Sequence, residues 1–426
     1  MTYRDQMKRT TFIFIGILLA AILLSGCAES TEKATSESED ITIGALLPLT
    51  GNLASIGEAS QAAIEVSTED INGYFSGLGS GKNVDVIVKD TESNPEKALE
   101  QLKELDAMGI TMVIGPQASN EVEAVLDYAN ENGIILLSTA STAPSLGIPD
   151  DNLFRLVPED TNQGMALAKF MQQDEISIVI PMYRNDVWGT GLVDEIEKSF
   201  EALDGTVLEG VMYETDNVDL SAEVESLNEK VVAATSEYDD GSIAVVLCSY
   251  GEVTEIFALA QTYPALSEVD WYGTDGIALN KGLINDDDAA DFAATTNLKA
   301  PMYGYVRQND RYQEIAPRIE EQLGRVPESY ALTTYDACWI ATFVDLDALP
   351  DDKESIKMAM NTITDTYFGI SGWTILNENG DREYWNYDIW TVTEADGSYQ
   401  WELYGKILLP VKDNMIIMRG EELIFV

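Results

Sequence analysis

The chain has 426 residues, of which 74 are acidic and 25 basic, so its formal net charge at pH 7 is −49. Nucleic acid and anionic membrane surfaces are excluded as natural partners, because both are bound through basic residues. There is no histidine, which excludes Ser-His-Asp catalysis and histidine-based zinc sites. The length and the apolar fraction of 45% predict a folded protein of two or three domains.

Residues 1–26 have the pattern of a secretory signal peptide, with a basic start and an apolar stretch over 12–24 that is too short to span a membrane. The sequence Leu24-Ser25-Gly26-Cys27 resembles the lipobox of prokaryotic lipoproteins. That resemblance implies cleavage before Cys27 and a lipid on its sulfur, and the alternative is an uncleaved anchor. Either case predicts an extracytoplasmic protein held at the outer face of the cytoplasmic membrane. Residues 27–40 are rich in Ser, Thr and Glu and are expected to form a flexible tether.

The first half of the chain alternates between strand and helix patterns, which predicts a doubly wound α/β fold with a parallel sheet. Strands are expected at 41–49, 84–90, 111–115 and 134–138, and helices at 58–75, 95–108 and 120–130.

The alternation then starts again and predicts a second α/β sheet of similar size. Strands are expected at 176–180, 206–213, 242–248 and 269–273, and helices at 162–173, 191–203, 220–235 and 253–263. Further helices are expected at 310–323 and 330–346, followed by a β-hairpin over 368–392 that turns at Asn379-Gly380.

The strand at 134–138 ends in a row of small side chains from Ser138 to Ala143. Ligands of parallel sheets bind at the carboxyl ends of the strands. Small residues there allow a ligand to approach the backbone, and hydroxyls can donate hydrogen bonds to it. A helix start at Pro144 would explain the same residues, so their position alone leaves both interpretations open.

Several segments together resemble the type I periplasmic binding proteins that serve branched-chain amino acid ABC transporters. They occur in the order 43–58, 112–146, 183–192, 247–252, 271–280 and 335–341.

The resemblance covers about residues 41–405 and implies two Rossmann-like lobes joined by three crossovers that close on a ligand. The crossovers are expected near 153–158, 274–280 and 360–370. Lobe 1 would then comprise 41–157 and 277–365, lobe 2 would comprise 158–276 and 366–410, and 411–426 would form a C-terminal tail.

The resemblance also implies a ligand site. In lobe 1, Ser119, Ala140, Ser141 and Thr142 match positions that hold the α-carboxylate and α-amine of an amino acid. Hydroxyls and free N–H groups at a helix start suit an anion, although a simple helix cap is the alternative for Ser119. In lobe 2, Trp188 matches a residue that closes over the ligand, where many relatives have Tyr; a core residue is the alternative.

Three further positions complete the predicted site. Tyr250 matches a second aromatic residue of the family's site. Asp275 matches the acid that pairs with the α-amine, where close relatives have Glu, and a turn residue before Gly276 is its alternative. Ile56 replaces a Tyr in the side-chain pocket. These departures leave amides, urea-like solutes and aromatic carboxylates open as ligands.

The function implied is that of a solute-binding component of an ABC importer, with the permease subunits as partners and a small amino acid as ligand. A ligand-binding sensor of the same fold is the alternative. No cofactor or metal site is expected, because the acidic run 285–291 lacks the spacing of a calcium loop. No motif places a catalytic acid pair, so an enzyme is not expected. Cys248 and Cys338 are expected to be buried thiols.

The acidic residues are spread over the whole chain, and we interpret them as a solvated surface whose charges repel one another. Raising the salt concentration from about 0.1 M to about 1 M shortens the Debye length from about 10 Å to about 3 Å. We therefore expect the melting temperature of the purified protein, followed by circular dichroism, to rise with salt. A melting temperature that does not respond to salt contradicts this interpretation.

Overall fold

A computed structural model describes residues 40–305, 307, 309–349, 352–411, 414–419 and 422–425. The expected signal peptide, the lipidation site Cys27 and most of the tether lie outside these residues. None of the helices in the described part of the chain is long and apolar enough to cross a membrane.

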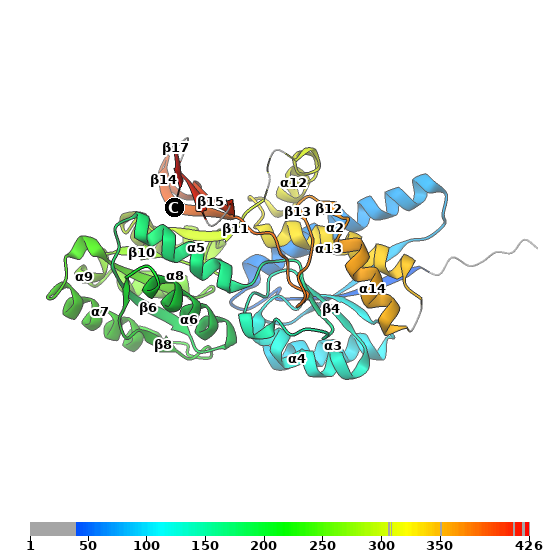
Figure 1. Cartoon of the computed structure of the whole chain (residues 1–426), viewed down its shortest axis with the longest axis horizontal. Coiled ribbons are helices and arrows are strands. Elements are labelled where there is room, and N and C mark those ends of the chain that lie inside the picture. The colour runs from blue at the N-terminus through cyan, green and yellow to red at the C-terminus, as the bar shows by residue number, and fades with distance from the viewer. Residues whose placement is uncertain are drawn as a thin grey trace, which may run out of the picture. The chain divides into compact units, whose positions relative to one another are not determined.

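The first sheet is parallel, with its strands in the order β2-β1-β3-β4-β5 (Figure 1). Its strands are β1 (Ile41–Leu47), β2 (Val84–Asp90), β3 (Met112–Ile114), β4 (Ile135–Ser138) and β5 (Leu153–Arg155), connected by α2 (Ala54–Leu78), α3 (Pro95–Ala107) and α4 (Ser119–Asn132). Capping residues fix the helix ends. The Asn94 side chain accepts a hydrogen bond from the Lys97 N–H at the start of α3. Gly133 ends α4 with a backbone in the left-handed region. The predicted parallel sheet is confirmed.

The second sheet is also parallel, in the order β10-β9-β6-β7 with β8 beside β6. Its strands are β6 (Ile178–Arg184), β7 (Thr206–Val207), β8 (Val211–Tyr213), β9 (Ile243–Cys248) and β10 (Asp270–Tyr272), and its helices are α5 (Asp160–Gln173), α6 (Val187–Glu201), α7 (Ser221–Thr235), α8 (Val253–Ala260) and α9 (Pro264–Ser267).

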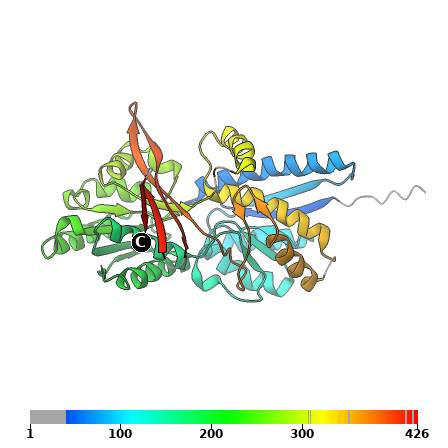
Figure 2. The same ribbon diagram turned by 45° about the horizontal axis from the view of Figure 1, so that its top comes forward.

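A third, antiparallel sheet takes up the C-terminal part of the chain (Figure 2). Its order is β11 (Ala300–Tyr303), β14 (Tyr387–Ala395), β15 (Ser398–Val411), β16 (Asn414–Arg419) and β17 (Glu422–Phe425). Of the residues expected as a tail, 414–419 and 422–425 therefore form strands. The long hairpin turns at Asp396-Gly397, where both residues have positive φ, as a two-residue turn requires. The predicted turn at Asn379-Gly380 forms, but it closes only a single bridge between Leu376 and Arg382.

The remaining helices decide where each lobe ends. Helices α12 (Asp310–Leu323) and α13 (Ser329–Asp347) pack on α2, and α14 (Lys353–Thr364) packs on α13. Helices α10 (Lys281–Asn285) and α11 (Asp287–Thr295) instead pack beside α8. We therefore call residues 40–155 and 310–382 lobe 1, and residues 160–303 and 387–425 lobe 2.

These boundaries differ from the expected ones in two places. Residues 277–303 belong with lobe 2, because Leu283 and Phe292 are buried in the same core as Val245 of the second sheet. The chain thus returns to lobe 1 after Tyr303 and not near 274–280. Residues 366–382 belong with lobe 1, because Asp381 pairs with Arg155 at the end of β5.

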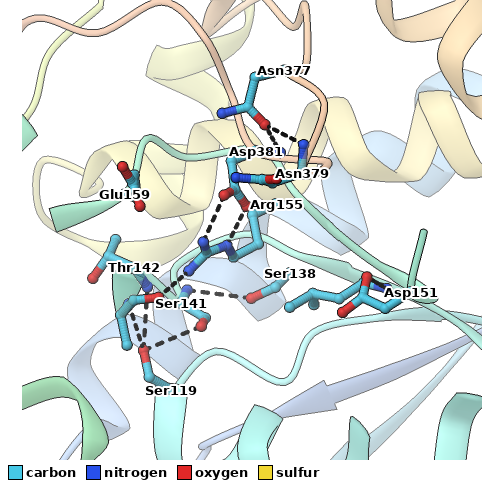
Figure 3. Close-up of polar contacts among 12 residues, drawn as sticks. Ser119, Ser138, Ser141, Thr142, Asp151, Arg155, Glu159, Asn377, Asn379 and Asp381 are labelled. Carbon is cyan, nitrogen blue, oxygen red and sulfur yellow. Dashed lines mark hydrogen bonds and ion pairs between the residues drawn. The ribbon is translucent and has the colours of Figure 1, made fainter. Parts of the chain in front are cut away.

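This buried ion pair joins two of the segments that cross between the lobes (Figure 3). The Arg155 guanidinium donates to both carboxylate oxygens of Asp381, from Nε at 2.5 Å and from the second terminal nitrogen at 2.8 Å. The backbones are also paired, since Arg155 N donates to Gly380 O and Arg382 N donates to Arg155 O. Arg382 in turn donates to Leu156 O and lies over the ring of Tyr303. The three crossing segments are therefore held side by side.

We expect Asp381→Ala to destabilise the protein by about 3–5 kcal/mol, because it leaves the Arg155 charge buried without a partner. Urea denaturation followed by circular dichroism measures the loss. Lys198→Ala is the matched control, since its i,i+3 pair with Glu195 leaves the lysine side chain 70% exposed and such pairs contribute at most about 1 kcal/mol. Equal stability of the two variants would show that the buried pair has no special role.

Candidate functional site

A small cavity lies where the carboxyl ends of strands from both sheets meet, the position at which α/β folds bind ligands. Its volume is about 20 Å³, which is room for about one water molecule. Lobe 1 contributes Leu53, Ile56, Gln117, Ser119, Ala140 and Tyr330, and lobe 2 contributes Trp188, Tyr250, Asp275 and Gly276. Six of the predicted site residues thus line one cavity: Ile56, Ser119, Ala140, Trp188, Tyr250 and Asp275. That they bind a ligand stays a prediction.

Ser119 connects the cavity to the loop after β4 (Figure 3). Its Oγ accepts hydrogen bonds from the backbone N–H groups of Thr142 and Ala143, both at 3.2 Å, and lies 3.1 Å from Ser141 Oγ. Helix α4 begins with Ser119 itself, after Ala118. The Ser119 hydroxyl therefore does not cap its own helix, and it holds the loop that carries Ser141 and Thr142 against the start of α4.

The hydroxyls of the small-residue row after β4 hold the loop in place. Ser138 Oγ donates to Pro116 O at 2.6 Å and accepts from Ser141 N at 3.2 Å. The row is followed by only one short 3₁₀ turn, Pro144–Leu146, and no side chain caps it. The helix-cap interpretation is therefore wrong, and one residue of the row, Ala140, lines the cavity.

The two predicted aromatic residues lie against each other. The rings of Trp188 and Tyr250 are stacked, with centroids 4.5 Å apart and planes inclined by 25°. Trp188 lies in the first turn of α6, whose start is fixed by Asp186 accepting from Gly189 N at 2.8 Å. Both residues also belong to a buried apolar core, so Trp188 fills the core with one side and faces the cavity with another.

Asp275 is one of two buried carboxylates that share an amide. Gln163 Nε2 donates to Asp275 Oδ1 at 2.9 Å and to Asp160 Oδ1 at 2.8 Å. Gln163 Oε1 accepts from the Asp275 N–H, and the Tyr330 hydroxyl donates to Asp275 Oδ2. The turn-residue alternative for Asp275 does not account for these side-chain contacts.

The two carboxylates disfavour each other's ionised form. Burial raises the pKa of Asp275, and burial together with the charge of Asp275 raises the pKa of Asp160. The Thr142 hydroxyl partly offsets the rise at Asp160. Yet neither Thr142 Oγ1 nor Asp160 Oδ2 completes a hydrogen bond of normal geometry within the described residues. The arrangement favours a proton or an added cation beside the two acids.

The residues that our sequence analysis missed are Asp160, Gln163, Tyr330, Gln117 and Leu53. Asp160 and Gln163 had a detectable pattern, because an acid and an amide three residues apart at a helix start lie on one face, and this helix follows directly after the first crossover. Tyr330 had none, since an aromatic residue in a helical segment is most often part of the core.

Across the part of the chain that the structure describes, no three Cys, Asp or Glu side chains form a group that could hold a metal ion. Cys248 and Cys338 are both free and buried, which confirms the expected thiols.

Comparison with known proteins gives three kinds of match. The model of the family "receptor family ligand binding region" matches residues 59–395. An uncharacterized protein of Methanocaldococcus jannaschii is 30% identical over 411 residues, which are 91% of this chain and 95% of that protein. A Leu/Ile/Val-binding protein homolog of Brucella abortus is 27% identical over 228 residues, which are 52% of this chain and 57% of that protein. The crystal structure of a leucine-binding protein from Thermotoga maritima superposes with a TM-score of 0.71 at 20% identity, covering 89% of this chain and 99% of that one.

Proposed function

We propose that this chain, which belongs to the receptor ligand-binding family and has the fold of type I periplasmic binding proteins, is the solute-binding component of an ABC importer. Its ligand would be a small amino acid with an apolar side chain, bound between the lobes and released unchanged. The observation that carries this proposal is the cavity. On one side it has Asp275, which shares Gln163 with the buried Asp160 and forms no ion pair within the described residues, and on the other it has a helix start with hydroxyls.

The acidic side suits an ammonium group. Asp160 and Asp275 are buried next to each other, and no ion pair with Lys or Arg reaches either of them within the described residues. An ammonium group would neutralise this charge and supply a donor for Asp160 Oδ2, which lacks one. Buried carboxylates are stable in the ionised form when such a partner is present.

The opposite side suits a carboxylate. The first N–H groups of α4 have no partner within the helix, and the helix dipole is positive there. Ser119 is the first residue of α4, and the Ser141 hydroxyl lies beside it. A zwitterion would then meet charges of opposite sign at both ends, with Ile56, Trp188 and Tyr250 around its side chain.

The size of the cavity implies movement. An amino acid is much larger than the one water molecule for which there is room, so binding requires the lobes to separate and the Trp188–Tyr250 pair to shift. Opening and reclosing about a hinge is a common mechanism of ligand capture. Only the closed form brings surfaces of both lobes together in one fixed arrangement for the permease.

We expect Asp275→Asn to weaken the binding of leucine, isoleucine or valine at least about tenfold, because the ammonium group loses its charged partner. Isothermal titration calorimetry with these amino acids measures the change. Glu159→Gln is the matched control. Glu159 precedes Asp160 in the sequence, and Glu159 does not line the cavity. Tight binding of 4-methylpentanoate, which is leucine without its amine, would contradict the proposal, and so would unchanged affinity of Asp275→Asn.

The location and the transport partner are also part of the proposal. We propose that a lipid on Cys27 holds the protein at the outer face of the cytoplasmic membrane, next to the permease. We expect Cys27→Ser to move the full-length protein from the membrane to the soluble fraction, measured by fractionation and immunoblotting. Retention of the variant in the membrane would indicate an uncleaved anchor. Genes for a permease and an ATPase adjacent to this one would support import, and their replacement by genes for a signalling receptor would contradict it.

A further inference from the structure

One loop of lobe 1 reaches across to lobe 2 beside the cavity. Asn52 lies between β1 and α2, and its carbonyl oxygen accepts a hydrogen bond from Gly251 N at 2.9 Å. Its side-chain Nδ2 donates to Glu252 Oε1, also at 2.9 Å. A Cβ on Gly251 would lie 2.8 Å from the Asn52 carbonyl oxygen, so this close approach requires the glycine.

Glu252 is the centre of a buried charge network in lobe 2. Its Oε1 is paired with Arg184 NH1, and Arg184 Nε is paired with Asp186 at 2.9 Å. The side chains of all three residues are at most 8% exposed. Glu252 Oε2 also accepts from Tyr250 N at 2.9 Å. The same carboxylate that Asn52 contacts therefore fixes the backbone of a residue that lines the cavity.

The network also holds the ring of Tyr250. The guanidinium carbon of Arg184 lies 4.1 Å from the centre of that ring, a cation–π distance. The ring of Tyr250 also stacks on that of Trp188, with the centroids 4.5 Å apart. Contacts thus run without a gap from Asn52 in lobe 1 through Glu252 and Arg184 to the aromatic pair over the cavity.

We propose that Asn52 and Glu252 form a latch, in which Asn52 is a positioning residue that couples closure of the lobes to the placement of Tyr250. The proposal rests on the proposed function, since it concerns the affinity of that site. Asn52 itself does not line the cavity. When the lobes separate, the bond to Glu252 breaks, but Glu252 keeps Arg184. The latch therefore stabilises the closed form alone, and the apparent affinity for a ligand of the closed form depends on how often that form is populated.

A second contact between the lobes offers a comparison. Lys281 Nζ lies 3.2 Å from a carboxylate oxygen of Glu58, but these side chains are 51% and 45% exposed. Exposed ion pairs are screened by water and salt, so this pair is expected to contribute little to closure. Asn52 is also exposed, but its bond ends on the Glu252 carboxylate, whose side chain is only 8% exposed, and a hydrogen bond to a buried charged group is stronger.

We expect Asn52→Ala to weaken amino acid binding about three- to tenfold, mainly through faster dissociation. Calorimetry and stopped-flow tryptophan fluorescence measure the two effects. Lys281→Ala is the control and should change the affinity less than about twofold. Asn52→Asp places a second carboxylate against Glu252 and should weaken binding further, with partial recovery at high salt. Because Asn52 is exposed, the melting temperature of Asn52→Ala should match that of the wild type.

Closure can be measured without any ligand, which separates the latch from the proposed function. Leu78 in lobe 1 and Val232 in lobe 2 are exposed and can carry spin labels. Double electron–electron resonance between the two labels then measures the distance between the lobes. Asn52→Ala should shift the unliganded protein toward longer distances. If the wild type binds no amino acid but this shift occurs, the latch stands and the proposed ligand is wrong. If Asn52→Ala shows wild-type distances and wild-type affinity, the latch is wrong.

Discussion

The structure depends most on the buried pair of Arg155 and Asp381. Burying two charges is tolerated when the pair is bidentate and further hydrogen bonds reach the ions, and both conditions hold. The one guanidinium nitrogen that does not face Asp381 donates to Ala143 O at 2.7 Å. Ala143 ends the loop that Ser119 holds at the cavity. Arg155 thus joins two crossing segments and also holds the loop beside the cavity. A change at Arg155 would therefore affect both the crossing segments and the candidate site.

Asp275 at the cavity and its neighbour Asp160 differ from several other buried acids of this very acidic chain. Asp381 and Glu252 each have an arginine partner. Asp336 accepts from two backbone N–H groups and a serine hydroxyl. Asp160 and Asp275 instead share one amide. Burial raises the pKa of these two acids, and it also raises those of Asp336 and Glu121. What sets Asp160 apart is that the charge of a second buried acid, Asp275, raises its pKa further, and a cationic ligand would give a physical reason for such a pair.

Sequence patterns predicted the α/β alternation because short buried strands and helix ends have local causes, such as the Asn94 cap before Pro95. The prediction that Trp188 and Asp275 belong to a ligand site came from a resemblance that extends over most of the chain. The sequence could not predict which lobe residues 277–303 join. Leu283 and Phe292 are apolar and could be buried against either lobe, so only the folded structure shows that they pack in the core of the second sheet. Asp160 was missed for a similar reason: its partner Asp275 is far away in sequence, and only the folded chain brings the two together.

Under the proposed function, the contacts between the lobes divide into permanent and conditional ones, and this division would explain how a nearly filled cavity can bind a ligand. The Arg155–Asp381 pair lies at the crossing segments, so we expect it to persist whether the lobes are open or closed. The bond from Asn52 to Glu252 would exist only in the closed form. In that form the Trp188–Tyr250 pair occupies space beside Asp275 that a ligand would need. Closure without ligand therefore buries two acids without a cation, whereas closure on an ammonium group neutralises them. On this proposal the acids oppose the empty closed form and favour the loaded one, and this difference would allow a ligand to control closure.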